Sequence, residues 1–155
     1  MKVSDILRVK GQSGGTLFTI GPMEPLDSAV NIMAEKDMGS LLVMEGGELV
    51  GVLSFREVIQ TLSRHGGKLE GLTVRHAMET NPLTCSTDTS IDEVRRMMLG
   101  SHARYIPILD NRVLQGVISF YDVAKSVVDS QNFENQMLKA YIKDWPSGTP
   151  EPEHP

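Results

Sequence analysis

The chain has 155 residues, 40% of them hydrophobic, and a formal net charge of −5, so it can bury one ordinary core. Its Lys and Arg residues are scattered, which argues against the basic stripe that nucleic-acid binding requires. There is no signal-peptide pattern, no apolar run of membrane-helix length and only one cysteine, Cys85, so we expect a soluble cytoplasmic protein with neither nucleic-acid nor membrane partners.

The first half of the chain predicts a short helix followed by strands and two longer helices. Val3 to Val9 forms one or two helical turns, and the Gly/Ser-rich stretch from Gly11 to Gly15 forms a loop. We place Pro25 at the first position of the next helix and its end at Gly39. The pattern predicts strands at 17–20, 40–44 and 48–53, a hairpin turn at 45–47, and a helix at 55–64.

The second half follows the same plan. The residues 83–85 predict a short strand, and Thr89 with Asp92 predicts a capping box at the start of a helix. Strands at 105–109 and 113–118 flank a turn at 110–112. Pro107 belongs at a sheet edge or beside a cleft, because proline has no N–H to donate. The last helix, 120–143, carries an apolar stripe longer than a small domain needs.

The two halves are copies of one another. An offset of 65 positions places Gly51-Val52-Leu53-Ser54-Phe55 on Gly116-Val117-Ile118-Ser119-Phe120, and Asp5-Ile6-Leu7 matches His76-Ala77-Met78 at an offset of 71. The first copy therefore carries six extra residues around 10–15. Such self-similarity indicates an internal duplication. We divide the chain into a first repeat at 1–65, a linker at 66–73, a second repeat at 74–128, a helical extension at 129–144 and a disordered tail at 145–155.

A β-α-β-β-α unit used twice, with Gly116-x-x-Ser119-x-x-Asp122 at the last strand–helix corner, resembles the tandem CBS (cystathionine β-synthase-type) domain. The resemblance covers roughly Val3 to Val128 and looks like a stand-alone pair. It implies an α/β (α+β) fold in which two repeats pack with pseudo-twofold symmetry. It also implies homodimerisation through helices, and two related clefts for adenosine-containing ligands such as AMP, ADP, ATP, NAD or S-adenosylmethionine.

Each repeated corner has two interpretations. Ser54 with Glu57, and Ser119 with Asp122, have capping-box spacing, and a cap alone contributes about 1 kcal/mol. The same helix N-terminus offers free N–H groups to a phosphate. The resemblance implies that the serine approaches phosphate or ribose and that the aspartate holds the ribose. Asp122 matches this pattern, whereas Glu57 places its carboxylate one methylene further out.

Other site candidates come from segments that the resemblance places beside the clefts. Arg104 suits a bidentate phosphate contact, or is a solvated charge; its counterpart in the first repeat is Gly39. Lys10 either folds over phosphates with the glycine loop or belongs to a surface loop. Thr19 and Thr84 either edge a cleft or reflect β-propensity. Tyr105, Ile106 and Pro107 either supply apolar walls and backbone groups for adenine or belong to core or edge packing. The remaining ligand-site candidates are the first-repeat residues Ile20, Ser40 and Leu41.

Two functions compete. The first is a regulatory module that binds AMP, ADP, ATP or NAD between the repeats and signals energy or redox state to an unidentified protein partner in trans. The second is a ligand-independent homodimerisation or scaffold module with vestigial clefts. An enzyme is the weakest hypothesis, because the four histidines lack ligand spacing for a metal and no nucleophile motif or Walker loop is present. We therefore predict neither a metal nor catalysis, and ligand dependence separates the first two functions.

Overall fold

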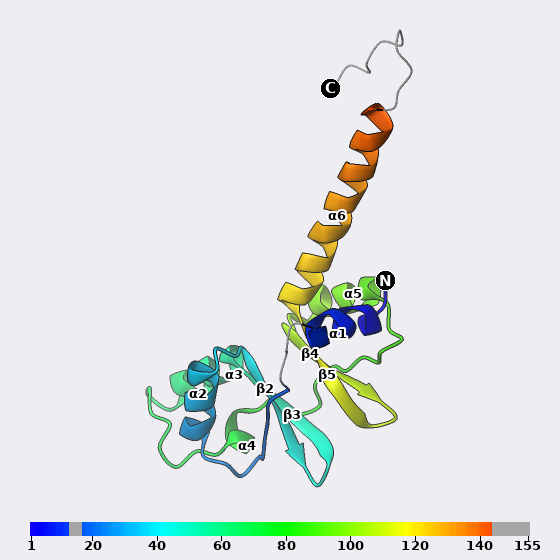
Figure 1. The fold of residues 1–155 in the computed structure, drawn as a ribbon. Coiled ribbons are helices and arrows are strands. Elements are labelled where there is room, and N and C mark those ends of the chain that lie inside the picture. Colours follow the sequence, from blue (N-terminus) through cyan, green and yellow to red (C-terminus); the bar gives the residue numbers. More distant parts are fainter. Residues whose placement is uncertain (13–16, 144–155) are drawn as a thin grey trace. The chain divides into compact units, whose positions relative to one another are not determined.

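The structure is a computed structural model that describes residues 1–12 and 17–143. The chain divides into two units, Met1–Val123 and Ala124–Pro155, and the first contains both repeats except for the end of the last helix. The elements are drawn in Figure 1. The predicted tail at 145–155 and most of the predicted Gly/Ser loop lie outside the described residues.

The first repeat contains a three-stranded sheet and two helices. Its elements are β1 (Thr19–Ile20), α2 (Leu26–Glu35), β2 (Ser40–Glu45), β3 (Glu48–Ser54) and α3 (Phe55–Arg64). β1 runs parallel to β2, which pairs antiparallel with β3. Gly46 and Gly47 have φ values of 59° and 81°, which a two-residue hairpin turn requires. The predicted hairpin, its two strands and α3 are confirmed, whereas the strand predicted at 17–20 is limited to Thr19–Ile20.

The ends of α2 differ from the prediction. Pro25 is the N-cap rather than the first helical residue, because its ψ of 138° keeps it in an extended conformation. The helix ends at Glu35 with Lys36 as C-cap, and Asp37 adopts a left-handed φ of 52°. This turn stops the helix before Gly39, where we had predicted its end.

The second repeat contains α4 (Val74–Ala77), α5 (Ile91–Ser101), β4 (Tyr105–Asp110), β5 (Val113–Ser119) and α6 (Phe120–Lys143). β4 and β5 form an antiparallel pair. The predicted strand at 83–85 was wrong, since only Cys85 forms a bridge, opposite Ile108. The predicted cap at Thr89 was also wrong. Ser90 caps α5 by accepting the Glu93 N–H at 3.1 Å, while the Thr89 hydroxyl accepts the Ser86 N–H.

The helix that opens each repeat packs against the other repeat. α1 (Val3–Gln12) contributes Val3 and Ile6 to the core of the second repeat, and the Val3 N–H donates to the Thr89 carbonyl at 2.9 Å. Conversely, Val74 of α4 belongs to the core of the first repeat. A repeat of about 60 residues is marginal alone, so this exchange of helices lets each half complete the core of the other.

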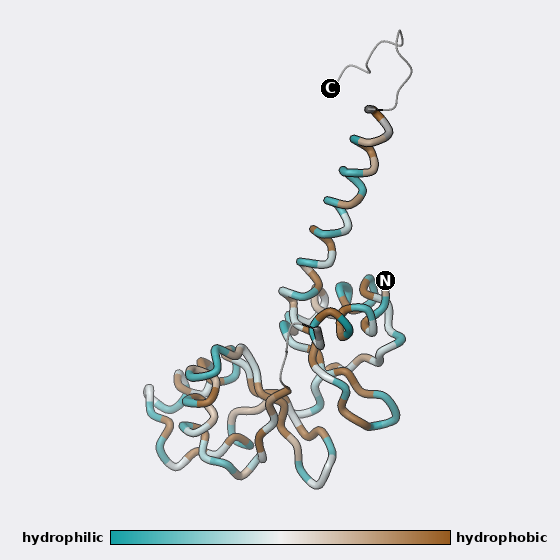
Figure 2. The backbone as a smooth tube through the Cα atoms, in the orientation of Figure 1, coloured by the Kyte–Doolittle hydropathy of each residue, from teal (hydrophilic) through white to brown (hydrophobic). Residues whose placement is uncertain are grey.

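The two repeats keep the same strand register. Ser40 lies opposite Ser54 in the first sheet, and Tyr105 lies opposite Ser119 in the second. β3 also lies against β4 and β5, so the strand–helix corners of both repeats approach one another. The most hydrophobic backbone segments follow the strands of both repeats (Figure 2), as expected for strands that carry the buried side chains.

The helix α6 continues from the second repeat into the second unit. Four large apolar side chains between Phe133 and Ile142 are exposed by 37% or more: Phe133, Met137, Leu138 and Ile142. These apolar residues belong to the predicted stripe, which is therefore present among the described residues of α6. Within the part of the chain that the structure describes, every helix is too short or too polar to cross a bilayer.

Candidate functional site

Both strand–helix corners form the predicted capping boxes. The Ser119 N–H donates to Oδ2 of Asp122 at 2.8 Å, and the Asp122 N–H donates to Oγ of Ser119 at 3.1 Å. In the first repeat the Ser54 N–H donates to Oε2 of Glu57 at 2.8 Å, and the Ser54 hydroxyl also bonds to that carboxylate. Each acid is thus turned back onto the first turn of its helix.

Asp122 has a second partner from the other end of the chain. Nζ of Lys10 lies 2.9 Å from Oδ2 of Asp122 and 2.9 Å from the carbonyl oxygen of Val117. The side chains of Lys10 and Asp122 are 34% and 14% exposed. Lys10 therefore lies at the corner of the second repeat, on the last turn of α1, rather than in a surface loop.

A cleft of about 390 Å³ lies between the two corners. Its walls bring together four predicted site residues, Ser54, Arg104, Tyr105 and Ser119, with Phe55, Arg56, Phe120 and Tyr121. The Arg104 guanidinium lies 4.6 Å from the centroid of the Phe120 ring, which is cation–π geometry. The first residues of α3 and α6 both line this cleft, so the positive ends of two helix dipoles are directed at one space.

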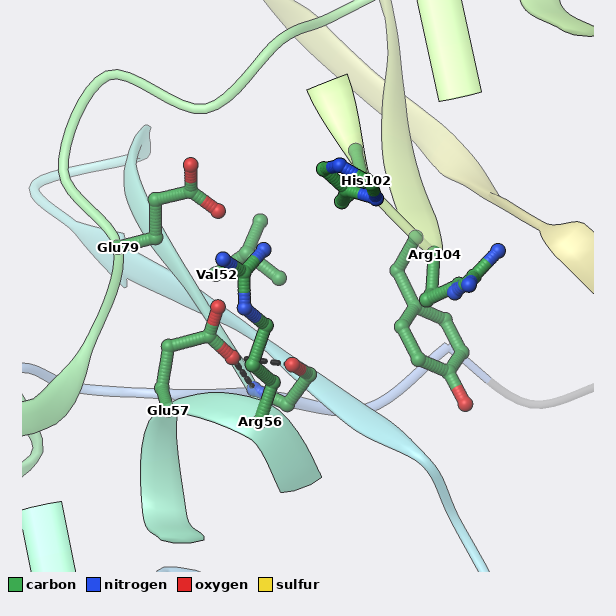
Figure 3. A pocket seen from close by; sticks show the side chains of 9 residues that line it. Val52, Arg56, Glu57, Glu79, His102 and Arg104 are labelled. Atoms are coloured by element: carbon green, nitrogen blue, oxygen red, sulfur yellow. Dashed lines mark hydrogen bonds between the residues drawn. The ribbon is translucent and has the colours of Figure 1, made fainter. Parts of the chain in front are cut away.

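A smaller pocket of about 20 Å³ adjoins the corner of the first repeat. This is roughly the room that one water needs. Figure 3 shows Arg56, Glu57 and Glu79 on one side of it, and His102 and Arg104 on the other. Arg104 belongs to the second repeat in sequence, yet it lines this pocket at the corner of the first repeat, across from Glu57. The structure thus combines candidates across the repeats rather than within each one.

The space at Gly39 explains why the corners differ. A Cβ built on Gly39 would lie 1.7 Å from the Tyr105 hydroxyl oxygen, so no larger residue fits opposite that ring. Gly39 is the counterpart of Arg104, and the first repeat therefore offers no arginine to the cleft at this position. Burial raises the pKa of Tyr105, and the nearby Asp122 carboxylate raises it further. The hydroxyl stays protonated and remains a hydrogen-bond donor.

The other predicted contacts are not gathered in these pockets. Leu41 and Ile106 are 0% exposed and belong to the two cores, which for Ile106 is the packing alternative that the sequence left open. Pro107 and Ile20 are buried too, and Thr19 and Thr84 are exposed. Ser40 is buried opposite Ser54. The strands β2 and β4 are buried over consecutive residues, Ser40–Val43 and Ile106–Ile108. Since successive side chains of a strand point to opposite faces, both faces of each strand are covered there.

Four residues that line the central cleft were missed as site candidates: Phe55, Arg56, Phe120 and Tyr121. The signal for the two phenylalanines was present, since both follow the capping serine in the duplicated segment. Arg56 and Tyr121 also correspond to each other but differ in type. His102 and Glu79, which line the smaller pocket, lie outside the repeated motif and gave no such signal.

Two features of the described residues bear on the metal and nucleophile hypotheses. No three His, Cys, Asp or Glu side chains among them lie close enough to hold a metal ion. Burial, together with the smaller effects of the negative charges of Asp110 and Glu93, raises the pKa of Cys85 to about 11. The Cys85 thiol is therefore protonated at neutral pH, whereas a nucleophile requires the thiolate.

Comparison with known proteins identifies the fold. A model of the CBS domain matches residues 15–64 and again residues 74–129. The chain belongs to the CBS domain family. Its two CBS domains follow one another in tandem, and together with the long C-terminal helix they form the α/β fold of a CBS pair. The resemblance read from the duplicated corners is confirmed.

Three similar proteins illustrate the match. A putative signal-transduction protein with CBS domains from Burkholderia ambifaria is 30% identical; the match covers 84% of this chain and 96% of that one, with a TM-score of 0.78. The mitochondrial CBS domain-containing protein CBSX3 of Arabidopsis thaliana is 26% identical, with 91% of this chain and 71% of CBSX3 covered. CBSX2, crystallised in complex with AMP, shares the fold at 23% identity and a TM-score of 0.67, with 84% and 98% covered.

Proposed function

We propose that this CBS pair is a regulatory module that binds an adenosine-containing ligand, AMP, ADP, ATP or NAD, and signals to a protein partner in trans. The observation that carries the proposal is the Ser119–Asp122 corner, where a mostly buried carboxylate lies at the N-terminus of a long helix. A carboxylate accepts hydrogen bonds from both hydroxyls of a ribose, and helix N–H groups donate hydrogen bonds to phosphate oxygens. The complex of CBSX2 with AMP supports this ligand class by analogy of fold.

The central cleft supports the same proposal. Its volume of about 390 Å³ suits a small-molecule ligand, and Arg56 and Arg104 bring positive charge to its wall. Arginine grips phosphate in bidentate fashion, while the rings of Phe55, Phe120 and Tyr121 offer flat apolar surface. We place the phosphate end of the ligand in this cleft and the ribose at Asp122.

Signalling requires that the ligand bind one arrangement of the protein better than another. In this proposal the ligand contacts corners from both repeats, so its binding changes how the repeats hold each other. The free thiol of Cys85 supports a reducing compartment, and we propose the cytoplasm. The relative CBSX3 of Arabidopsis thaliana is a mitochondrial protein.

Thermal unfolding against AMP, ADP, ATP, NAD, NADH, S-adenosylmethionine and adenosine tests the proposal. A ligand at a hundredfold excess over its Kd stabilises by about 2.7 kcal/mol, which for a protein of this size is a Tm shift on the order of 5–10 °C. Arg104→Ala should reduce the shift with nucleotides and leave that with adenosine. Arg95→Ala serves as the control, because Arg95 lies on α5, pairs with Asp92 and does not line the cleft. A flat panel from ligand-free protein would overturn the proposal.

A second function is favoured by one specific observation. Phe133, Met137, Leu138 and Ile142 of α6 are all exposed, and apolar side chains grouped on one helix indicate a surface for association. We propose that α6 supports a homodimer whether or not ligand is bound. Sedimentation equilibrium of wild type and Leu138→Asp checks this: the variant should dissociate at concentrations at which the wild type is dimeric. A monomeric wild type contradicts it.

A further inference from the structure

The carboxylate of Asp122 is already occupied by groups of the protein itself. Its Oδ2 atom accepts the Ser119 N–H at 2.8 Å and the Lys10 ammonium at 2.9 Å. A carboxylate oxygen has two lone pairs, so these two donors saturate Oδ2. A ribose diol that donates to both oxygens of Asp122 must therefore displace one donor. The Ser119 N–H is part of the backbone, which leaves Lys10 as the donor that can move.

The duplication shows that Lys10 is an addition to the repeat. α1 has ten residues and its counterpart α4 has four, and the first repeat carries six extra residues around 10–15. The extra helical turns bring Lys10 to the corner. No lysine of α4 exists to do the same at Glu57, because α4 consists of Val-Arg-His-Ala.

Val117 gives Lys10 a second acceptor at this corner. Its carbonyl oxygen lies 2.9 Å from the Lys10 ammonium, so one side-chain donor connects β5 with the carboxylate of Asp122. A side chain can leave both acceptors without moving the strand.

We propose that Lys10 is a latch that holds the second corner closed until a ligand displaces it from Asp122. This inference rests on the proposed function, since it concerns the same ribose-binding carboxylate. In the closed state the ammonium neutralises Asp122 and fastens the last turn of α1 to β5. In the open state both carboxylate oxygens face the ribose, and the last turn of α1 is released. The last turn of α1 therefore cannot be fastened to β5 through Lys10 while the ligand is bound at Asp122.

Calorimetric titration of the full chain with adenosine and with AMP tests the latch. Lys10→Met removes the ammonium and keeps the length of the side chain, and we expect it to bind adenosine about tenfold more tightly, because a charge-assisted bond no longer competes. Arg8→Met is the matched control: Arg8 lies on the same helix, is exposed, and does not contact Asp122. Its affinity should equal that of the wild type.

Hydrogen exchange of the wild type gives a second measurement that does not depend on a variant. The ligand should raise the exchange rate of the backbone amides in the last turn of α1 and lower the rate at the Ser119–Asp122 corner. A binding site without a latch would show only the lowered rate. Three results would overturn the latch and leave the proposed function standing. The affinity of Lys10→Met could be equal to or weaker than that of the wild type, or Arg8→Met could gain the same affinity. The ligand could also slow hydrogen exchange in the last turn of α1. Absence of binding in wild type and in Lys10→Met overturns both.

Discussion

The ion pair between Lys10 and Asp122 should be measurable as a coupling free energy in the absence of any ligand. Asp122→Ala removes both the capping-box acceptor and the partner of Lys10. The cap contributes about 1 kcal/mol. The pair, with side chains 34% and 14% exposed, contributes about 0.5–1 kcal/mol once solvent screening is taken into account. We therefore expect the free energy of unfolding to fall by about 1.5–2 kcal/mol.

Glu57→Ala is the matched control that separates the two contributions. Glu57 holds the equivalent place in the first capping box, and the ion pairs found among the described residues do not include it. It should therefore cost only the cap, about 1 kcal/mol. The difference between the two variants gives the share of the ion pair at the second corner.

Urea denaturation of wild type, Asp122→Ala, Lys10→Met and the double variant completes a thermodynamic cycle, with fluorescence and circular dichroism compared as a check of two-state unfolding. We expect a coupling of about 0.5–1 kcal/mol between the two sites. Additive effects, to within about 0.3 kcal/mol, would refute the argument. In that case Lys10 and Asp122 do not interact in solution, and the latch has no physical basis.

Two further outcomes follow from the packing. Gly51→Ala should lower the free energy of unfolding by about 1–3 kcal/mol, because its new Cβ would lie 2.8 Å from the Glu79 backbone oxygen. Gly116→Ala should cost less, since there the atom at 2.8 Å is the flexible end of the Leu7 side chain. Equal costs of the two variants in urea denaturation would contradict this argument. Cys85, with its pKa raised to about 11, should react with a thiol reagent at pH 8 only as fast as the protein unfolds. Rapid modification of the folded protein would show that the thiol is neither buried nor protonated.

The repeated corners were predictable because a capping box is a local structure. Ser119 and Asp122 are three residues apart, and the bonds between them form within one helical turn whatever surrounds it. The hairpin at Gly46-Gly47 was predictable for the same reason, since its left-handed φ values are set by residue type. The two errors lie where other contacts decided the local structure. At Leu83–Cys85 only the bridge from Cys85 to Ile108 forms. At Thr89 the hydroxyl accepts the Ser86 N–H, and the neighbouring Ser90 caps the helix instead.

The partners of these corners were not predictable from the sequence. The spacing of 112 residues between Lys10 and Asp122 carries no local signal, and nothing in the order of residues indicates that α1 completes the core of the second repeat. The same is true of Arg104, which lines one pocket together with Glu57 of the other repeat. These contacts depend on how the two halves exchange helices, which is settled by the burial of apolar surface across the whole unit.

The sequence by itself determined the duplication, the elements of each repeat and the two capped corners, because residues close in the chain encode turns, caps and periodic faces. Only the tertiary structure decided which candidates meet. It buried Ile106 and Leu41 in separate cores and brought Lys10 to Asp122. The physical reason is that local bonds depend on a few neighbours, whereas a cleft is what remains after the whole core has been packed.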